Sequence, residues 1–93
     1  MIRSFKCRET ERIFNLRISL KLPQLIQKTA LRKLCMLDAA TNISDLTAPP
    51  SNHLKKLTGD GKGKYSIRVN DQWRICFGWK DGSSYDVEII DYH

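Results

Sequence analysis

The sequence has little of what marks a membrane, secreted or fibrous protein. Its 93 residues contain no apolar run near the roughly 20 residues that a membrane-spanning helix requires. No apolar segment follows the charges of the N-terminal MIRSFKCRET, so we expect no signal peptide. Hydrophobic residues make up 41% and charged residues 28% of the chain, which is typical of one globular domain over residues 1–93. We expect this domain to lie in the cytoplasm and to make no membrane contact.

Cysteine and histidine are also scarce, and their spacing argues against disulfide or metal chemistry. Cys7, Cys35 and Cys76 are too far apart for a CxxC knuckle or a disulfide framework, so we expect three reduced and mostly buried thiols. The two histidines, His53 and His93, have no further histidine or suitably spaced cysteine with which to bind zinc. We therefore expect no metal and no other cofactor.

Positive charge, in contrast, is in excess and unevenly distributed. The net charge is +6; nine of the sixteen basic residues lie within residues 3–33 and the other seven within residues 55–80. The last thirteen residues carry four acids and no Lys or Arg. Such an excess in a small intracellular domain favours a polyanionic partner, most often nucleic acid, although a basic helix face is more often merely solvated.

The first half of the chain has helical periodicity. Residues 2–7 alternate and could form a short first strand, and Ile13 and Leu16 recur at helical spacing in a short helix over 9–16. A long amphipathic helix is predicted over 22–40, with its basic residues among the positions between the apolar ones. The apolar positions are Leu22, Leu25, Ile26, Ala30, Leu34, Leu37 and Thr41, and the basic ones are Lys28, Arg32 and Lys33.

The second half changes to a period of two after a break. Residues 41–52 form a connector with at most one turn, at 42–45, because Pro49-Pro50 excludes regular structure there. Alternating apolar residues then predict strands over 65–69, 73–79 and 85–92, with tight turns at 70–72 and at Asp81-Gly82. Three strands with short links form an antiparallel meander, whose apolar face only the long helix can cover. The predicted class is α+β: a small twisted antiparallel sheet with the N-terminal helices packed on one face.

The other face of this sheet carries two arginines. By alternation, Arg68 and Arg74 lie opposite the large apolar residues, near the facing ends of two neighbouring strands. Adjacent Ile89 and Ile90 cannot both be core residues without a bulge or burial on two sides. The arginines could serve a ligand, or they could simply solvate an exposed sheet surface.

The glycine-rich GDGKGK at 59–64 superficially resembles a phosphate-binding loop. A Walker A motif needs four residues between its glycines and a Ser or Thr after the Lys, whereas here three residues separate Gly59 from Gly63, and Tyr65 follows Lys64. We interpret the segment as a basic loop.

Two segments together carry a more specific pattern: LKKLTGDGKGKYSIRVNDQWRICFGW and the terminal VEIIDYH. They resemble the RelE/ParE superfamily of bacterial toxins, and specifically its HigB branch, which includes GraT-like proteins. The start MIRSFKC, the segment RKLCMLDAAT and the DL before the prolines match as well, so the resemblance covers nearly the whole chain. It implies a RelE-like fold and the activity of a metal-independent endoribonuclease that cuts mRNA in the ribosomal A site. It also implies a cognate HigA-type helix-turn-helix antitoxin. The toxin would contact operator DNA only through this antitoxin.

The resemblance assigns roles to particular residues. Arg74 is the expected phosphate and transition-state ligand, with Arg68 as a second cation. Of the terminal triad, His93 or Asp91 is expected to transfer protons and Tyr92 to stack on or orient a base. The remaining RNA contacts are expected from Lys56, Lys62, Lys64 and His53.

One position departs from the family pattern. Lys55 stands where members of the branch can carry a catalytic histidine, so either Lys55 or the neighbouring His53 would replace it. The nearby Asp91 and the α-carboxylate predict a raised pKa for His93, which suits a general acid. Three alternatives stay open: a non-catalytic nucleic-acid-binding module, a ParE-like gyrase inhibitor, which the DYH ending disfavours, and a toxin that has lost its activity.

Overall fold

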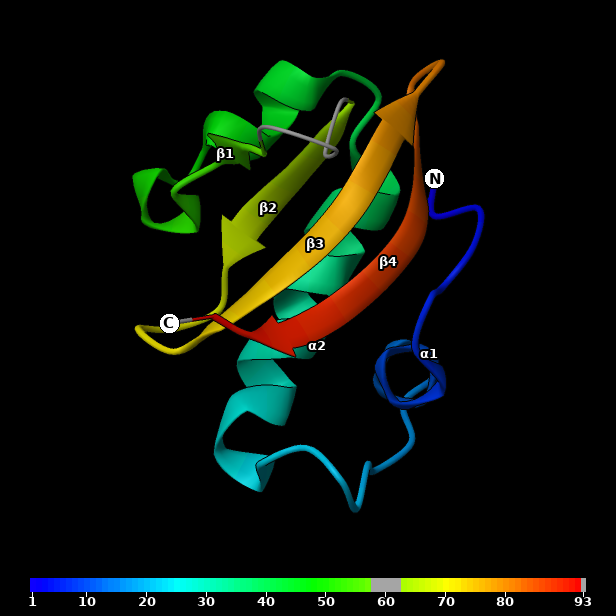
Figure 1. The fold of residues 1–93 in the computed structure, drawn as a ribbon, viewed down its shortest axis with the longest axis vertical. Helices are drawn as coiled ribbons and strands as arrows, with labels where there is room; N and C mark the ends of the chain where they lie inside the picture. The colour runs from blue at the N-terminus through cyan, green and yellow to red at the C-terminus, as the bar shows by residue number, and fades with distance from the viewer. Residues whose placement is uncertain (58–62, 93) are drawn as a thin grey trace.

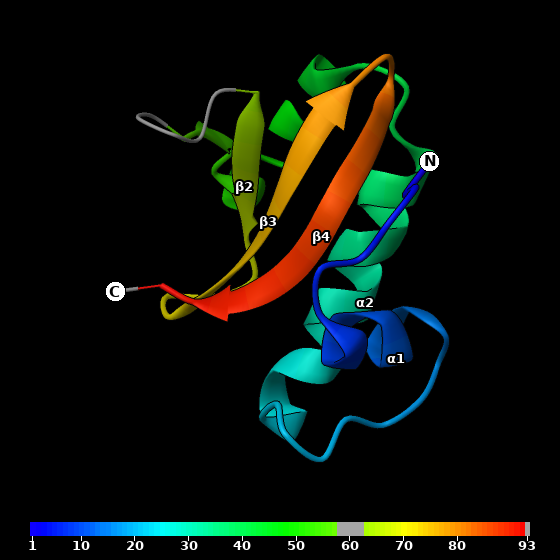
Figure 2. The same ribbon diagram turned by 45° about the vertical axis from the view of Figure 1, so that its right-hand side comes forward.

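The structure is a computed structural model that describes residues 1–57 and 63–92. Its described strands form one antiparallel sheet in the order β1-β2-β3-β4, and α2 crosses behind this sheet (Figures 1 and 2). This confirms the predicted α+β class. The elements are α1 (Arg8–Phe14), α2 (Gln24–Ala39), the 3₁₀ turns η1 (Ile43–Thr47) and η2 (Pro50–Asn52), and the strands β1 (Lys55–Lys56), β2 (Lys64–Arg68), β3 (Trp73–Lys80) and β4 (Ser83–Asp91).

The core lies between α2 and the sheet, as the helical periodicity predicts. It consists mainly of aliphatic side chains from both layers, and Phe77 is its largest fully buried side chain. Leu25 departs from the prediction: it is 95% exposed, because it occupies the first turn of α2 and points away from the sheet. The helix contributes Ile26, Ala30, Leu34 and Leu37, and the sheet contributes Ile67, Ile75, Phe77, Val87 and Ile89.

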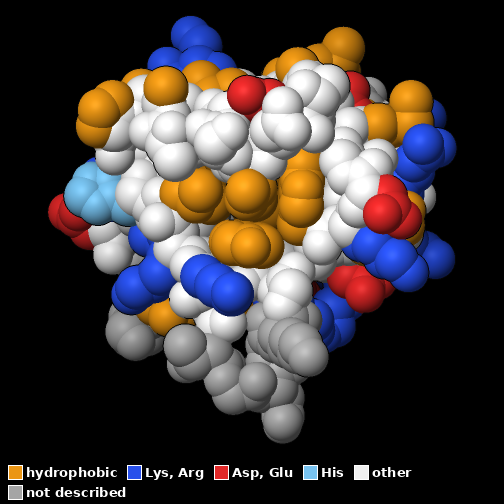
Figure 3. Space-filling model, turned by 90° about the horizontal axis from the view of Figure 1, so that it is seen from above, with side chains coloured by type: hydrophobic (Ala, Val, Ile, Leu, Met, Phe, Trp, Pro, Cys, Tyr) orange, Lys and Arg blue, Asp and Glu red, His pale blue; other side chains and the backbone are white. Residues whose placement is uncertain are grey.

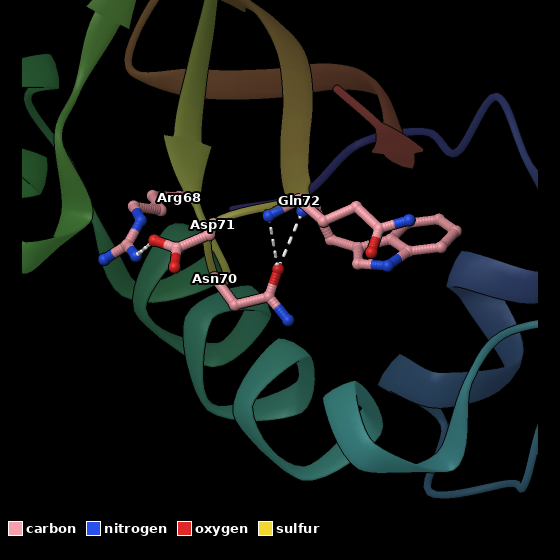
Figure 4. Close-up of polar contacts among 5 residues, drawn as sticks. Arg68, Asn70, Asp71 and Gln72 are labelled. Atoms are coloured by element: carbon pink, nitrogen blue, oxygen red, sulfur yellow. Dashed lines mark hydrogen bonds and ion pairs between the residues drawn. The ribbon is translucent and has the colours of Figure 1, made fainter. Parts of the chain in front are cut away.

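Both predicted turns are present. Asp81 and Gly82 have φ values of 53° and 76°, the left-handed pair that a two-residue hairpin requires between Lys80 and Ser83. At the β2–β3 turn, the Asn70 side-chain oxygen accepts the backbone N–H groups of Gln72 and Trp73, each at 2.8 Å (Figure 4).

The N-terminal segment differs from the prediction. Residues 2–7 form no strand of the sheet and meet β4 through two isolated parallel bridges, Ile2 with Ser84 and Phe5 with Val87. The reason lies in β4, which has one extra residue between the partners of Cys76 and Gly78, and Asp86 there has a φ of 52°. The irregularity interrupts the extended backbone that a continuous ladder would need.

Four smaller expectations are wrong. Leu16 is 80% exposed, because α1 already ends at Phe14. Pro50 begins the 3₁₀ turn η2, a first-turn position at which proline is tolerated. Lys33 is buried, because its amine reaches the buried Asn52 side chain. Of the three cysteines, Cys76 is buried, Cys7 is half-buried and Cys35 is exposed on α2.

Candidate active site

The face of the sheet opposite α2, here called the open face, gathers the predicted arginines. Arg68 pairs with Arg74 across β2 and β3, and Arg74 pairs with Ile90 across β3 and β4. Ile67, Ile75 and Ile89 form the neighbouring row and are buried in the core, so the arginines lie on the other face, as predicted. Ile89 and Ile90 thus face opposite sides of the sheet. The next row of the open face contains Lys55, Ser66, Cys76 and Glu88.

Arg74 is held rigidly at the centre of this face. Its Nε donates to Ser66 Oγ at 2.8 Å, and its Nη2 donates to the backbone oxygens of His53 at 2.5 Å and Ser66 at 3.2 Å. Burial lowers the pKa of the half-buried guanidinium, and nearby Arg68 lowers it further. An arginine remains charged at neutral pH despite such a shift. A fixed and partly desolvated cation of this kind is suited to binding a phosphate.

Tyr92 covers Arg74 from the C-terminal end of the sheet. The centroid of its ring is 5.7 Å from Arg74 Cζ and 5.7 Å from Lys55 Nζ, which is within the range of cation–π contacts. Its backbone N–H donates to the Gln72 oxygen at 2.7 Å and thereby continues the pairing beyond β4. Tyr92 thus brings the end of β4 close to Lys55 of β1, although these are the two edge strands of the sheet.

Arg68 lies at the margin of this cluster rather than at its centre. It forms an ion pair with Asp71 of the adjacent turn, and Figure 4 shows both side chains beside that turn. The Asp71 side chain is 98% exposed, so the pair is open to solvent and its energetic value is small. A phosphate could therefore replace Asp71 as the partner of Arg68 at little cost.

The other predicted residues fall into three groups. Lys64 is exposed and lies two residues before Ser66 on β2, so it belongs to the open face. The backbone oxygen of His53 accepts a hydrogen bond from Arg74 on the same face. Lys56 pairs with Tyr65 and Asp91 pairs with Trp73, so the pleat directs both side chains to the opposite face. Lys62 and His93, including the predicted pKa of His93, lie outside the described residues.

Asp91 is nevertheless tied to the same end of the sheet. Its Oδ2 accepts a hydrogen bond from Gln72 Nε2 at 3.1 Å, and the Gln72 backbone oxygen in turn accepts the Tyr92 N–H. Gln72 therefore connects two of the three residues of the predicted triad.

Three supporting residues were missed at the level of the sequence. Ser66 and Gln72 could have been found, because Ser66 shares the parity of Arg68 and Gln72 precedes the strand of Arg74. No sequence pattern pointed to Asn52. Its side-chain oxygen accepts a hydrogen bond from the Lys33 amine, and its side-chain nitrogen donates to the backbone oxygens of Leu46 and Ala48 at 3.1 and 3.2 Å. These bonds fix η2, which immediately precedes His53.

The surface seen from above mixes charged and apolar side chains. Lys and Arg side chains lie at several places around the edge of this view, with some Asp and Glu side chains beside them and hydrophobic side chains at the centre (Figure 3). Within residues 1–57 and 63–92, no group of three or more His, Cys, Asp or Glu side chains is placed to hold a metal ion. The same part of the chain contains no helix long and apolar enough to cross a bilayer.

Comparisons with known proteins give a consistent result. A family model described as "RelE-like toxin of type II toxin-antitoxin system HigB" matches residues 3–93. Toxin HigB-1 of Vibrio cholerae is 49% identical over 72 residues, which cover 77% of this chain and 75% of that protein. Endoribonuclease HigB of Proteus vulgaris is 32% identical over 93 residues and covers 100% of both chains. An uncharacterized protein of Haemophilus influenzae is 43% identical over 73 residues, or 78% of this chain and 71% of that protein.

Proposed function

The chain belongs to the HigB family of RelE-like toxins of type II toxin-antitoxin systems, and from this premise we propose that it cuts mRNA in the A site of the translating ribosome. The family makes it a toxin with an antitoxin partner, and the relative that matches over its full length is named an endoribonuclease. The chain is accordingly an endoribonuclease. We propose that its substrate is mRNA, that it acts in the cytoplasm, and that its partner is a HigA-type helix-turn-helix antitoxin that carries it to operator DNA.

The proposed chemistry uses the RNA as its own nucleophile. The 2′-OH of one nucleotide attacks the adjacent 3′ phosphate, a 2′,3′-cyclic phosphate forms, and the 5′ oxygen leaves with a proton. Such a reaction needs no metal ion and no covalent enzyme intermediate. It needs a cation at the phosphate, a group that takes the 2′-OH proton and a group that protonates the leaving oxygen.

The observation that carries the proposal is the convergence of Arg74 and Lys55 on the ring of Tyr92. Arg74, fixed by Ser66 and His53, supplies the charge for the scissile phosphate, and Arg68 supplies a second cation from the margin. Tyr92 offers a ring on which an unstacked base can lie. A ring flanked by two cations matches a nucleotide, which presents a base and a phosphate together.

Lys55 is the proposed substitute for the family histidine. The amine of an exposed lysine offers three hydrogen-bond donors and no acceptor, so it suits a phosphate oxygen. We therefore assign it to phosphate binding. Of the two residues expected to transfer protons, His93 or Asp91, we propose His93, because the pleat directs the Asp91 side chain to the opposite face, where it is joined to this end of the sheet through Gln72.

The experiment is cleavage mapping of a defined mRNA with purified toxin, with and without translating ribosomes. We expect cuts inside the A-site codon only when ribosomes translate, and a cyclic phosphate at the 3′ end of the upstream product. Efficient cutting of free mRNA would contradict the ribosome requirement. Inhibition of gyrase supercoiling without any RNA cleavage would instead favour the gyrase-inhibitor alternative.

A matched pair of variants tests Lys55. The neighbouring Lys56 pairs with Tyr65 and points to the other face, so it controls for loss of one positive charge on the same strand. We expect Lys55→Ala to lower the cleavage rate by about 10-fold or more, since a charge-assisted contact is worth about 1.5–3 kcal/mol, and Lys56→Ala to leave it nearly unchanged. If Lys55→Ala leaves ribosome-dependent cleavage untouched, the assignment of Lys55 is wrong.

A further inference from the structure

A second surface lies away from the open face, where the segment between α1 and α2 meets both helices. It contains a groove of about 260 Å³ whose apolar lining is formed by Ile13, Leu16, Ile18 and Leu31. Leu16 and Ile18 are 80% and 63% exposed, so they stand at the groove as open apolar walls. Large aliphatic side chains that cluster at the surface mark an interaction site more often than isolated ones do.

The segment that presents these side chains is fixed by hydrogen bonds. Ser19 N–H donates to Gln27 Oε1 at 3.1 Å, and Gln27 Nε2 donates to the backbone oxygens of Ser19 and Leu22, each at 2.8 Å. Ser19 Oγ donates to Glu9 at 2.7 Å, which ties the same segment to α1. The groove is therefore formed before a partner arrives, and a partner that binds it does not have to order this segment.

Leu16 occupies a position that ordinarily favours glycine. Its N–H donates to the Ile13 oxygen at 3.0 Å and the N–H of Arg17 donates to the Arg12 oxygen at 2.8 Å, which is the Schellman pattern at the end of a helix. The residue at this position of the motif is left-handed, and Leu16 has a φ of 64°. Glycine would suit this backbone better, so Leu16 presents an exposed aliphatic side chain at a position where the backbone conformation does not favour one.

The rim of the groove selects the charge of its occupant. Arg17 and Lys28 line it, and the adjacent hollow is lined by Arg12 and Lys21 together with Leu20 and Glu9. Glu9 is the one acid among the residues lining either hollow, and its carboxylate already accepts the Ser19 hydroxyl. An apolar floor with a basic rim complements a segment that has apolar side chains on one side and carboxylates on the other.

We propose that this groove is the docking surface for an acidic amphipathic segment of the antitoxin. Its apolar side chains would lie against Leu16 and Ile18, and its carboxylates would face Arg17 and Lys28. The inference rests on the antitoxin partnership described above. In both ribbon views the connection between α1 and α2 lies at the end of the molecule away from β1 (Figures 1 and 2). Docking and RNA cleavage can therefore be separated by mutation.

The test measures the affinity of purified cognate antitoxin by calorimetry, together with ribosome-dependent cleavage by each free toxin variant. Leu16→Gly suits the left-handed backbone and keeps the helix end, while it removes the wall of the groove; Ile18→Asp opposes the expected carboxylates. We expect each variant to weaken antitoxin binding by about 10-fold or more and to cleave mRNA like the wild type. Leu25→Asp changes a 95% exposed leucine that does not line the groove, and it should alter neither quantity.

Wild-type antitoxin affinity in Leu16→Gly and Ile18→Asp overturns the proposal, and so does an equal loss in Leu25→Asp. Sedimentation of the toxin with phosphatidylglycerol vesicles, lost in Ile18→Asp while antitoxin binding persists, would assign the surface to lipid instead. A failure of the proposed nuclease function would appear separately, as absence of cleavage by the wild type, and would leave the affinities readable.

Discussion

At the scale of single residues, the activity proposed for the open face depends on how Arg74 is held. Its three hydrogen bonds go to Ser66 and to the His53 backbone, so its guanidinium is oriented before RNA arrives. Preorganised charge of this kind costs no reorganisation when the negative charge of the transition state develops. Tyr92 adds an aromatic surface to the same point.

Tyr92 can be tested by separating its ring from its hydroxyl. Tyr92→Phe keeps the face that lies near Lys55 and Arg74, and we expect cleavage within about 3-fold of the wild type. Tyr92→Ala removes the stacking surface, and stacking of one base on an aromatic ring is worth about 1–3 kcal/mol, so we expect a loss of about 10-fold or more. The measurement is the single-turnover cleavage rate on programmed ribosomes. Equal losses in both variants would show that the hydroxyl, not the ring, carries the function.

At the scale of elements, the short η2 turn controls the position of the His53–Lys55 segment. The buried Asn52 side chain holds this turn through Lys33, Leu46 and Ala48. Burial is the main reason that the pKa of Lys33 is lowered, with further contributions from Arg32 and Arg68. A buried amine with such a partner is costly to leave unpaired.

Asn52→Ala is therefore expected to lower the free energy of unfolding by about 2–4 kcal/mol, because it strands the Lys33 amine as well as two backbone oxygens. Chemical denaturation measures this loss. The double variant Lys33→Met, Asn52→Leu replaces both polar partners by apolar groups, and it should recover part of the loss. A single variant as stable as the wild type would contradict the role of Asn52.

The η1 turn makes stability depend on pH. Asp45 accepts the backbone N–H groups of Asn42 and Thr41, which lower the pKa of its carboxyl below the ordinary value. Because the folded pKa is depressed, the stabilisation is present above the unfolded pKa of about 3.9 and is lost as the pH falls through the folded value. We expect Asp45→Asn to be less stable than the wild type at pH 7 and equally stable near pH 2, as thermal unfolding would show. A difference that persists unchanged in acid would contradict this.

At the scale of the whole molecule, the sequence predicts the sheet and α2 well, since strand alternation and helical periodicity report burial directly. It also predicts that Arg68 and Arg74 share a face, because parity alone decides this. It does not predict the Lys33–Asn52 contact, which joins residues 19 positions apart, or the burial of Lys33 within an apparently solvated helix face. The approach of Tyr92 to Lys55 likewise depends on the twist of the whole sheet, which no local pattern encodes.

The two proposed functions are assigned to different surfaces of the molecule. The open face presents cations around Tyr92, whereas the connection between α1 and α2 presents aliphatic side chains with a basic rim. A toxin of a toxin-antitoxin system needs both: one surface for its substrate and another that its antitoxin recognises. Separate surfaces allow each to be altered without loss of the other.

The most direct test of the central claim is the cleavage rate of Arg74→Ala on ribosomes programmed with a defined A-site codon. Lys56→Ala is the control, because it also removes one positive charge. Removal of one preorganised donor from a transition state costs about 100- to 1,000-fold in rate, and we predict a loss of this size for Arg74→Ala and none for Lys56→Ala. Circular dichroism and antitoxin affinity should remain those of the wild type. Wild-type cleavage by a folded Arg74→Ala variant would contradict the assignment of the active site to the open face.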